Sequence, residues 1–129
     1  MIGGPKLPAV RREFASIVLL GALALAGCGS SSSNSAAFVT QLDSLCIQGN
    51  AAVRHAHSIP AAADTFAGYL DKVRALTPPD RLKTPFSQFT SLLGQRLALL
   101  RQNKLVAAKR LHQPISVLAT RMGAAACAK

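Results

Sequence analysis

The chain has 129 residues and is strongly basic, with 15 Lys and Arg against five Asp and Glu and a formal net charge of +10 at pH 7. The part of the chain from about residue 36 onward, some 94 residues, is enough for one small domain with one core and not for two. A positive balance is typical of nucleic-acid-binding proteins. The N-terminal segment, however, predicts export from the cytoplasm, which argues against a nucleic-acid partner.

Residues 1–27 have the layout of a signal peptide. Lys6, Arg11 and Arg12 supply a basic start, and the 14 residues 14–27 are then apolar or small apart from one serine. As a helix these residues would reach about 21 Å, which is less than the roughly 30 Å hydrocarbon core of a bilayer. The segment therefore predicts export rather than a permanent membrane span.

The end of this segment, Leu25-Ala26-Gly27-Cys28, resembles the bacterial lipobox, in which a branched apolar residue and two small residues precede an invariant cysteine. The resemblance implies cleavage between Gly27 and Cys28 and a diacylglyceryl group, with further acyl chains such as palmitate, on Cys28. Two acyl chains hold a protein stably on a membrane. We therefore expect a lipoprotein on the extracytoplasmic face of the cell membrane; a plain signal peptide followed by an unrelated cysteine is the alternative.

The rest of the chain divides into a tether and a body. Residues 28–35 are predicted to be the lipidated cysteine and a flexible Ser-rich tether, and residues 36–129 to be one helical domain. Residues 1–27 hold three of the 15 Lys and Arg and one of the five acids, so 12 cations and four Asp remain, a balance of +8. A basic exported body is attracted to anionic lipid headgroups or anionic wall polymers. The sequence indicates no particular protein partner.

The cysteine count indicates a disulfide. With Cys28 assigned to lipid, Cys46 and Cys127 form an even pair in an oxidising compartment. A bond between them would close a loop of about 80 residues, for which the chain-entropy model gives about 4 to 5 kcal/mol. Two unpaired buried thiols are the alternative.

Apolar residues recur at spacings of three and four along the body, which predicts helices. Ser35 is placed to cap the first helix, with Cys46 on its buried face. Residues 58–60 interrupt the pattern, and a second helix is predicted to open at Ala63 or Asp64.

Prolines mark the later boundaries. Residues 77–80 end the second helix, because Pro lacks the amide donor and restricts the residue before it. The third helix, with its apolar pattern over residues 82–100, begins either near Pro79 with a kink or at Pro85 with Thr84 as its cap; the second start is preferred, since Pro suits the first helical position.

The last helix follows an interruption at Asn103 and Lys104. Pro114 is expected to bend this helix or to mark its true beginning, and Gly123 is a natural left-handed terminator. Four amphipathic segments with short connections predict an all-α, antiparallel four-helix bundle. Its first and last elements would be neighbours, which would let a bond between Cys46 and Cys127 fasten the C-terminal residues to the first helix.

Three short motifs mark the start, middle and end of the body: residues 38–46 followed by Asn50, residues 75–79, and Met122-Gly123 followed by Cys127. On these motifs the chain resembles a family of small exported actinobacterial proteins and lipoproteins with helical bodies and uncharacterised function. The resemblance implies a helical bundle with a disulfide between its two ends, and it implies no activity. Gln113-Pro114 departs from the pattern, which leaves the continuity of the last helix open.

The body offers little for catalysis. It contains no glutamate, and nothing in it resembles a zinc-protease helix, a phosphate loop or a nucleophile elbow. No catalytic residue and no cofactor is therefore predicted. The rival hypothesis is a metal-binding protein or small metal-dependent enzyme that uses His55, His57 and His112. On a helix, the spacing of two between His55 and His57 would point their side chains about 200° apart, so joint metal binding needs a loop or strand there.

Five cations cluster around the end of the third helix and the start of the fourth: Arg96, Arg101, Lys104, Lys109 and Arg110. Cations at a helix C-terminus are favoured by the helix dipole, so a solvated face near a turn is the simpler interpretation. The functional interpretation is a patch for anionic lipid or wall polymer. Taken together, the sequence favours a lipid-anchored envelope protein whose helical body is a non-catalytic binding or structural module.

Overall fold

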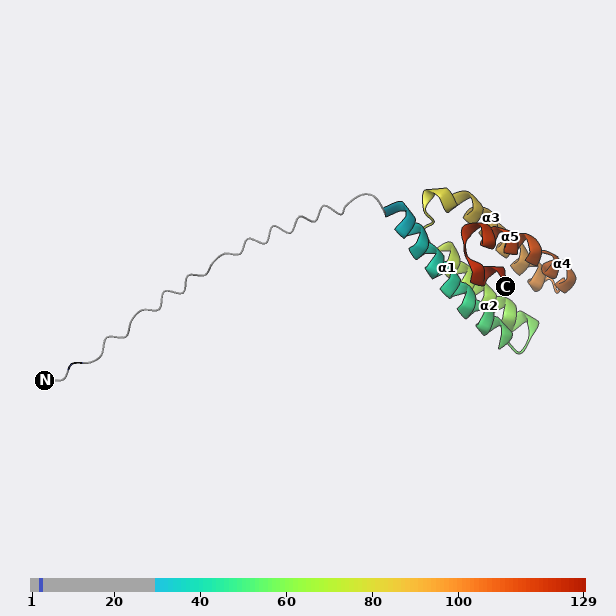
Figure 1. Ribbon diagram of the computed structural model, residues 1–129. Helices are drawn as coiled ribbons and strands as arrows, with labels where there is room; N and C mark the ends of the chain where they lie inside the picture. Colours follow the sequence, from blue (N-terminus) through green and yellow to red (C-terminus); the bar gives the residue numbers. More distant parts are fainter. Residues whose placement is uncertain (1–2, 4–29) are drawn as a thin grey trace.

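The structure is a computed structural model that describes Gly3 and residues 30–129. The described part of the chain forms an all-α bundle without strands, which confirms the predicted fold class (Figure 1). Short connections join neighbouring antiparallel helices, and the C-terminal residues 125–128 pack against the first helix of the bundle. The elements are α1 (Ser30–Arg54), α2 (Ile59–Arg74), the 3-10 helix η1 (Asp80–Leu82), α3 (Lys83–Arg101), α4 (Leu105–Arg110), α5 (His112–Met122) and the 3-10 helix η2 (Ala125–Ala128).

The core forms along the apolar faces that the spacing of three and four creates. Leu42 of α1, Leu70 of α2 and Phe89 of α3 are almost fully buried. At the end of the bundle where α1 begins, the rings of Phe38 and Phe86 meet edge to face, with centroids 5.1 Å apart and planes at 83°. Helix α1 packs on α2 and η2, and α3 packs on α2 and α5. One contiguous core therefore joins all four longer helices.

Helix α1 begins earlier than the sequence predicts. It starts at Ser30, so Ser35 lies inside the helix rather than capping it, and the predicted tether is helical from Ser30 onward. Ser35 is buried, and its Oγ accepts a hydrogen bond of 2.9 Å from Nε of Arg81. The hydroxyl that was expected to cap a helix end instead contacts a residue 46 positions away, so the predicted cap and the predicted end of the tether are wrong.

Helix α2 also begins earlier than predicted. Its first residue is Ile59, and the Oγ of Ser58 caps it by accepting a hydrogen bond of 3.2 Å from the amide of Ala61. Pro60 is the second helical residue, where an amide donor would have no partner within the helix. The predicted start at Ala63 or Asp64 is wrong because Pro60 belongs to the first turn and does not interrupt the helix.

The same physical rule explains the start of α3. This helix begins at Lys83, directly after η1, and Pro85 is its third residue. Neither predicted start, near Pro79 with a kink or at Pro85 behind a Thr84 cap, is correct. Amide donors in the first turn of a helix have no acceptor within it, so proline is tolerated throughout that turn.

In the C-terminal third, the helix boundaries agree more closely with those predicted from the sequence. Pro114 is the third residue of α5 and so marks its beginning, one of the two expected outcomes. Gly123 ends α5 in the left-handed conformation at φ 82°, as predicted. The six-residue α4, separated from α5 at Leu111, was not predicted. Within the described part of the chain, no helix has the length and apolar content needed to cross a membrane.

Candidate binding cleft at one end of the bundle

The predicted disulfide is present and joins the two ends of the body. Cys46 of α1 and Cys127 of η2 are bonded, with Cα atoms 5.1 Å apart. Two hydrogen bonds hold the same segment: Oδ1 of Asp43 accepts from the amide of Ala126 at 3.0 Å, and Oγ of Ser116 donates to the carbonyl of Ala128 at 2.9 Å. The four-residue η2 is thus fastened to both α1 and α5.

The predicted anchor lies elsewhere in the chain. Gly27 and Cys28 are outside the described residues, so the cleavage site and the lipid anchor stay predictions.

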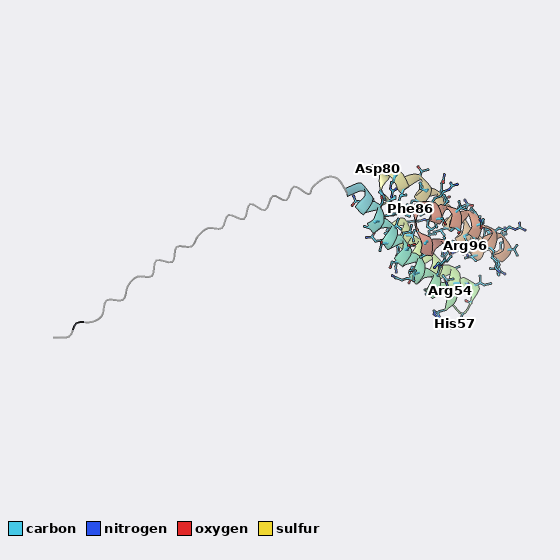
Figure 2. The ribbon with its side chains drawn as sticks, in the orientation of Figure 1. Arg54, His57, Asp80, Phe86 and Arg96 are labelled. Carbon is cyan, nitrogen blue, oxygen red and sulfur yellow. A yellow bond between two sulfur atoms is a disulfide. The ribbon has the colours of Figure 1, made fainter. Side chains whose placement is uncertain are left out.

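The three histidines of the metal-binding alternative are not brought together. His55 and His57 are exposed in the turn between α1 and α2, where Figure 2 labels His57 close to Arg54, and His112 is the exposed first residue of α5. Among the residues that the structure describes, no group of three or more His, Cys, Asp or Glu side chains could hold a metal ion. In the described part of the chain these three histidines are therefore kept apart.

The five predicted basic residues fall into two environments. Arg101, Lys104, Lys109 and Arg110 are exposed along the end of α3, the following turn and α4. Arg96, labelled in Figure 2, is half-buried and lines a cavity between the helices. The structure therefore sets Arg96 apart from the four exposed cations, and the patch for an anionic surface stays a prediction.

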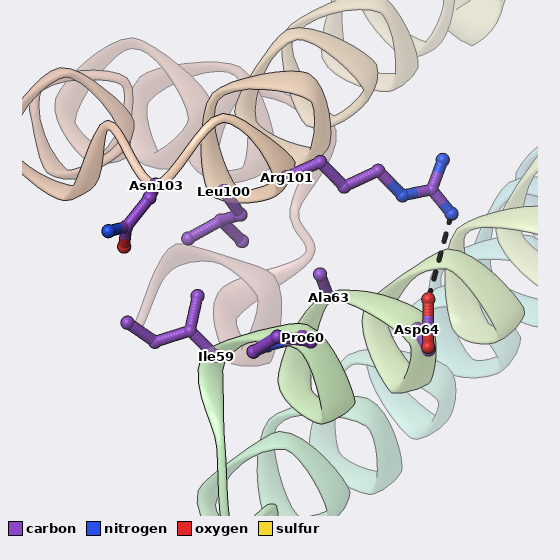
Figure 3. A pocket seen from close by; sticks show the side chains of 7 residues that line it. All are labelled: Ile59, Pro60, Ala63, Asp64, Leu100, Arg101 and Asn103. Atoms are coloured by element: carbon purple, nitrogen blue, oxygen red, sulfur yellow. Dashed lines mark ion pairs between the residues drawn. The ribbon is translucent and has the colours of Figure 1, made fainter.

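An open cleft of about 460 Å³ lies where the first turn of α2 faces the end of α3, and its lining side chains are drawn in Figure 3. The cap at Ser58 sets the start of α2 at this point, and Asn103, in the left-handed region at φ 58°, turns the chain directly after α3. Asn is one of the few residues besides glycine that adopts this conformation readily. The lining residues are Ile59, Pro60, Ala63, Asp64, Leu100, Arg101 and Asn103.

The cleft combines apolar walls with a pair of opposite charges. Nη2 of Arg101 lies 4.0 Å from Oδ1 of Asp64, and the two side chains are 56% and 80% exposed. Ion pairs of this kind contribute about 0 to 1 kcal/mol, so an anionic group on a ligand can replace the carboxylate at little cost. The volume lies within the range of about 300 to 1,000 Å³ that small-ligand sites occupy. The cleft therefore suits a ligand with an apolar part and an acidic group.

Comparison of the chain with protein-family models, with curated proteins and with solved structures finds no match. The lining residues of the cleft themselves indicate the chemistry of a ligand that it could bind. Sequence reasoning identified Arg101 as a candidate but missed the wall that Ile59, Pro60 and Leu100 supply. The signal that could have revealed part of it is Ser58-Ile59-Pro60, a capping residue followed by proline in a first helical turn.

Proposed function

We propose that this protein is a lipoprotein anchored through Cys28 on the extracytoplasmic face of the cell membrane, and that its helical body is a non-catalytic module that binds an anionic component of the cell envelope. The lipobox-like segment and the formal balance of +8 after residue 27 support this proposal. The observation that carries the binding role is the cleft, where the exposed guanidinium of Arg101 borders an apolar wall and has only a weak partner in Asp64.

The position of the cleft favours a wall polymer over lipid. The 25-residue α1 spans about 38 Å at 1.5 Å per residue. Cys28 precedes Ser30, where α1 begins, whereas Ile59 and Pro60 of the cleft follow the opposite end of that helix (Figure 1). A surface at the end remote from the anchor point is suited to a partner beyond the membrane. We therefore propose an anionic wall polymer as the partner, recognised by Arg101 together with the exposed Lys104.

Binding of the full-length protein, purified in detergent, to cell-wall particles tests this function. Arg101→Gln combined with Lys104→Gln is expected to weaken binding about tenfold or more, since each cation near an anionic surface contributes about 1 kcal/mol. Raising the salt concentration is expected to weaken binding of the parent, because exposed charges are screened. Lys83→Gln combined with Arg121→Gln removes two exposed cations outside the cleft and is the matched control.

Three results would contradict the proposal. The first is equal binding to particles whose anionic polymers have been removed. The second is an equal loss in the two double variants. The third is preferential binding to anionic vesicles, which would identify a lipid surface as the partner instead. The anchor is tested separately with Cys28→Ser, which is expected to abolish incorporation of labelled palmitate and to leave unprocessed precursor in the membrane; continued labelling would disprove lipidation at Cys28.

A further inference from the structure

A second cavity, distinct from the cleft, lies at the centre of the bundle where α1, α2, α3, α5 and η2 meet. Its volume is about 60 Å³, and both Cys46 and Cys127 of the disulfide border it. The apolar part of its wall comes mainly from α2 and α3, and polar side chains reach it from four elements. These include Asn50 of α1, Tyr69 of α2, Arg96 of α3 and His112 of α5.

The polar lining is rich in donors and poor in acids. The side chains of Asn50, Tyr69, Arg96 and Lys129, all residues that line the cavity, carry N–H or O–H groups, and no Asp or Glu side chain borders it. Of the two ion pairs in the described part of the chain, one joins Lys83 to Asp80 and the other joins Arg101 to Asp64. The guanidinium of Arg96 therefore forms no ion pair with the described residues.

The charge on Arg96 is held in a partly dehydrated place. Burial lowers the pKa of its guanidinium from the ordinary value, although an arginine stays protonated in proteins at neutral pH. Partial removal of a cation from water without a counter-charge is unfavourable. An anion bound beside Arg96 would compensate for this cost, and the donors of the same cavity could complete its hydrogen bonds.

We propose that the central cavity is a binding site for a compact oxyanion of phosphate size, held by Arg96 with Tyr69, Asn50 and His112 around it. A single water needs about 10 to 15 Å³ of such volume, so 60 Å³ admits a few waters or one small anion. The planar guanidinium can bind two oxygens at once, which suits phosphate and carboxylate groups. This site does not depend on the proposed function, because it shares no residue with the cleft.

The chain carries its own reporter for this site. It contains one tyrosine and no tryptophan, and that tyrosine, Tyr69, borders the cavity. Tyrosine fluorescence of the full-length protein in detergent is therefore measured as sodium phosphate replaces sodium chloride at constant ionic strength. We expect a saturable change in the parent, a loss of affinity of about tenfold or more in Arg96→Gln, and partial retention in Arg96→Lys.

Arg121→Gln is the matched control, because it removes an exposed arginine of α5 that borders neither the cavity nor the cleft and should leave the phosphate response unchanged. Circular dichroism establishes that each variant is folded. Linear, unsaturated quenching in the parent would overturn the proposal, as would an equal saturable response in folded Arg96→Gln. If Arg96→Gln does not fold, a response of Arg96→Lys equal to that of the parent in affinity also overturns the requirement for the guanidinium.

A second titration with glycerol phosphate distinguishes the two sources of the anion. Saturation by inorganic phosphate alone identifies a free ion, and saturation by the ester as well identifies a phosphate group carried by a larger molecule. A saturable response to neither compound overturns the site. Because wall binding is measured with Arg101 and Lys104 and phosphate binding with Arg96, failure of one proposal leaves the other intact.

Discussion

The disulfide side of the bundle and the cleft are held together by interactions of very different strength. On the disulfide side, a covalent bond and two hydrogen bonds fix the short η2 to α1 and α5. At the cleft, one exposed ion pair of 4.0 Å spans the gap between α2 and α3. A four-residue helix cannot bury enough surface to hold itself in place, whereas α2 and α3 already pack along their lengths. Covalent fastening is therefore found at one of the shortest elements, and the cleft keeps its charges accessible.

Among the substitutions considered, removal of the disulfide is expected to have the largest effect on the free energy of unfolding. Cys46→Ala combined with Cys127→Ala opens a loop with a sequence separation of 81 and should lower the free energy of unfolding by about 4 to 5 kcal/mol in the chain-entropy model. Urea unfolding of the full-length protein, followed by circular dichroism, measures this. Reduction of the parent protein is the control and should produce a similar loss. A loss below about 1 kcal/mol would mean that the hydrogen bonds alone hold η2, and the contrast with the cleft would disappear.

The disulfide, the helices and the end of α5 could be predicted from the sequence. The bond between Cys46 and Cys127 was predicted from an even count of cysteines together with the expectation of export to an oxidising compartment, and the helices were predicted from the spacing of apolar residues. Gly123 was identified as a terminator because few residues tolerate its positive φ. Each of these features depends on local chemistry or on a simple count, so the sequence was sufficient.

Helix starts and the cleft depend on information that is not local. Pro60 and Pro85 were interpreted as boundaries, yet both lie within a first turn, where proline costs no hydrogen bond. Ser35 was interpreted as a cap, but tertiary contact with Arg81 determines its role. The cleft joins Ile59 to Leu100, and no periodic pattern shows which helix ends will meet. The half-burial of Arg96 likewise follows from packing between α3 and its neighbours.

Substitution of Gly49, three residues after Cys46 on α1, is expected to have an effect of intermediate size on the free energy of unfolding. A Cβ atom built on Gly49 would lie 3.1 Å from Cγ of Tyr69, whereas a Cβ on Gly68 meets nothing within 4 Å. Gly49→Leu is therefore expected to lower the free energy of unfolding by about 1 to 3 kcal/mol through overpacking. The matched control Gly68→Leu should raise it by up to about 1 kcal/mol, because glycine is a poor helix former. Equal effects of the two substitutions in urea unfolding would show that α1 and α2 are not closely packed next to Cys46.

Substitutions at the cleft are expected to have the smallest effect on the free energy of unfolding. Arg101→Gln and Asp64→Asn should each change the free energy of unfolding by less than about 0.5 kcal/mol, because both side chains are largely exposed and their nearest charged atoms are 4.0 Å apart. A double-mutant cycle measures their coupling directly.

Asp43→Ala, which removes the acceptor for the amide of Ala126, is the matched substitution on the disulfide side. It should lower the free energy of unfolding by about 1 kcal/mol or more. A coupling above about 1 kcal/mol between Arg101 and Asp64 would make the pair a structural clamp. An anion would then have to break a stabilising contact to reach Arg101, and the cleft would lose the property that makes it a candidate binding site.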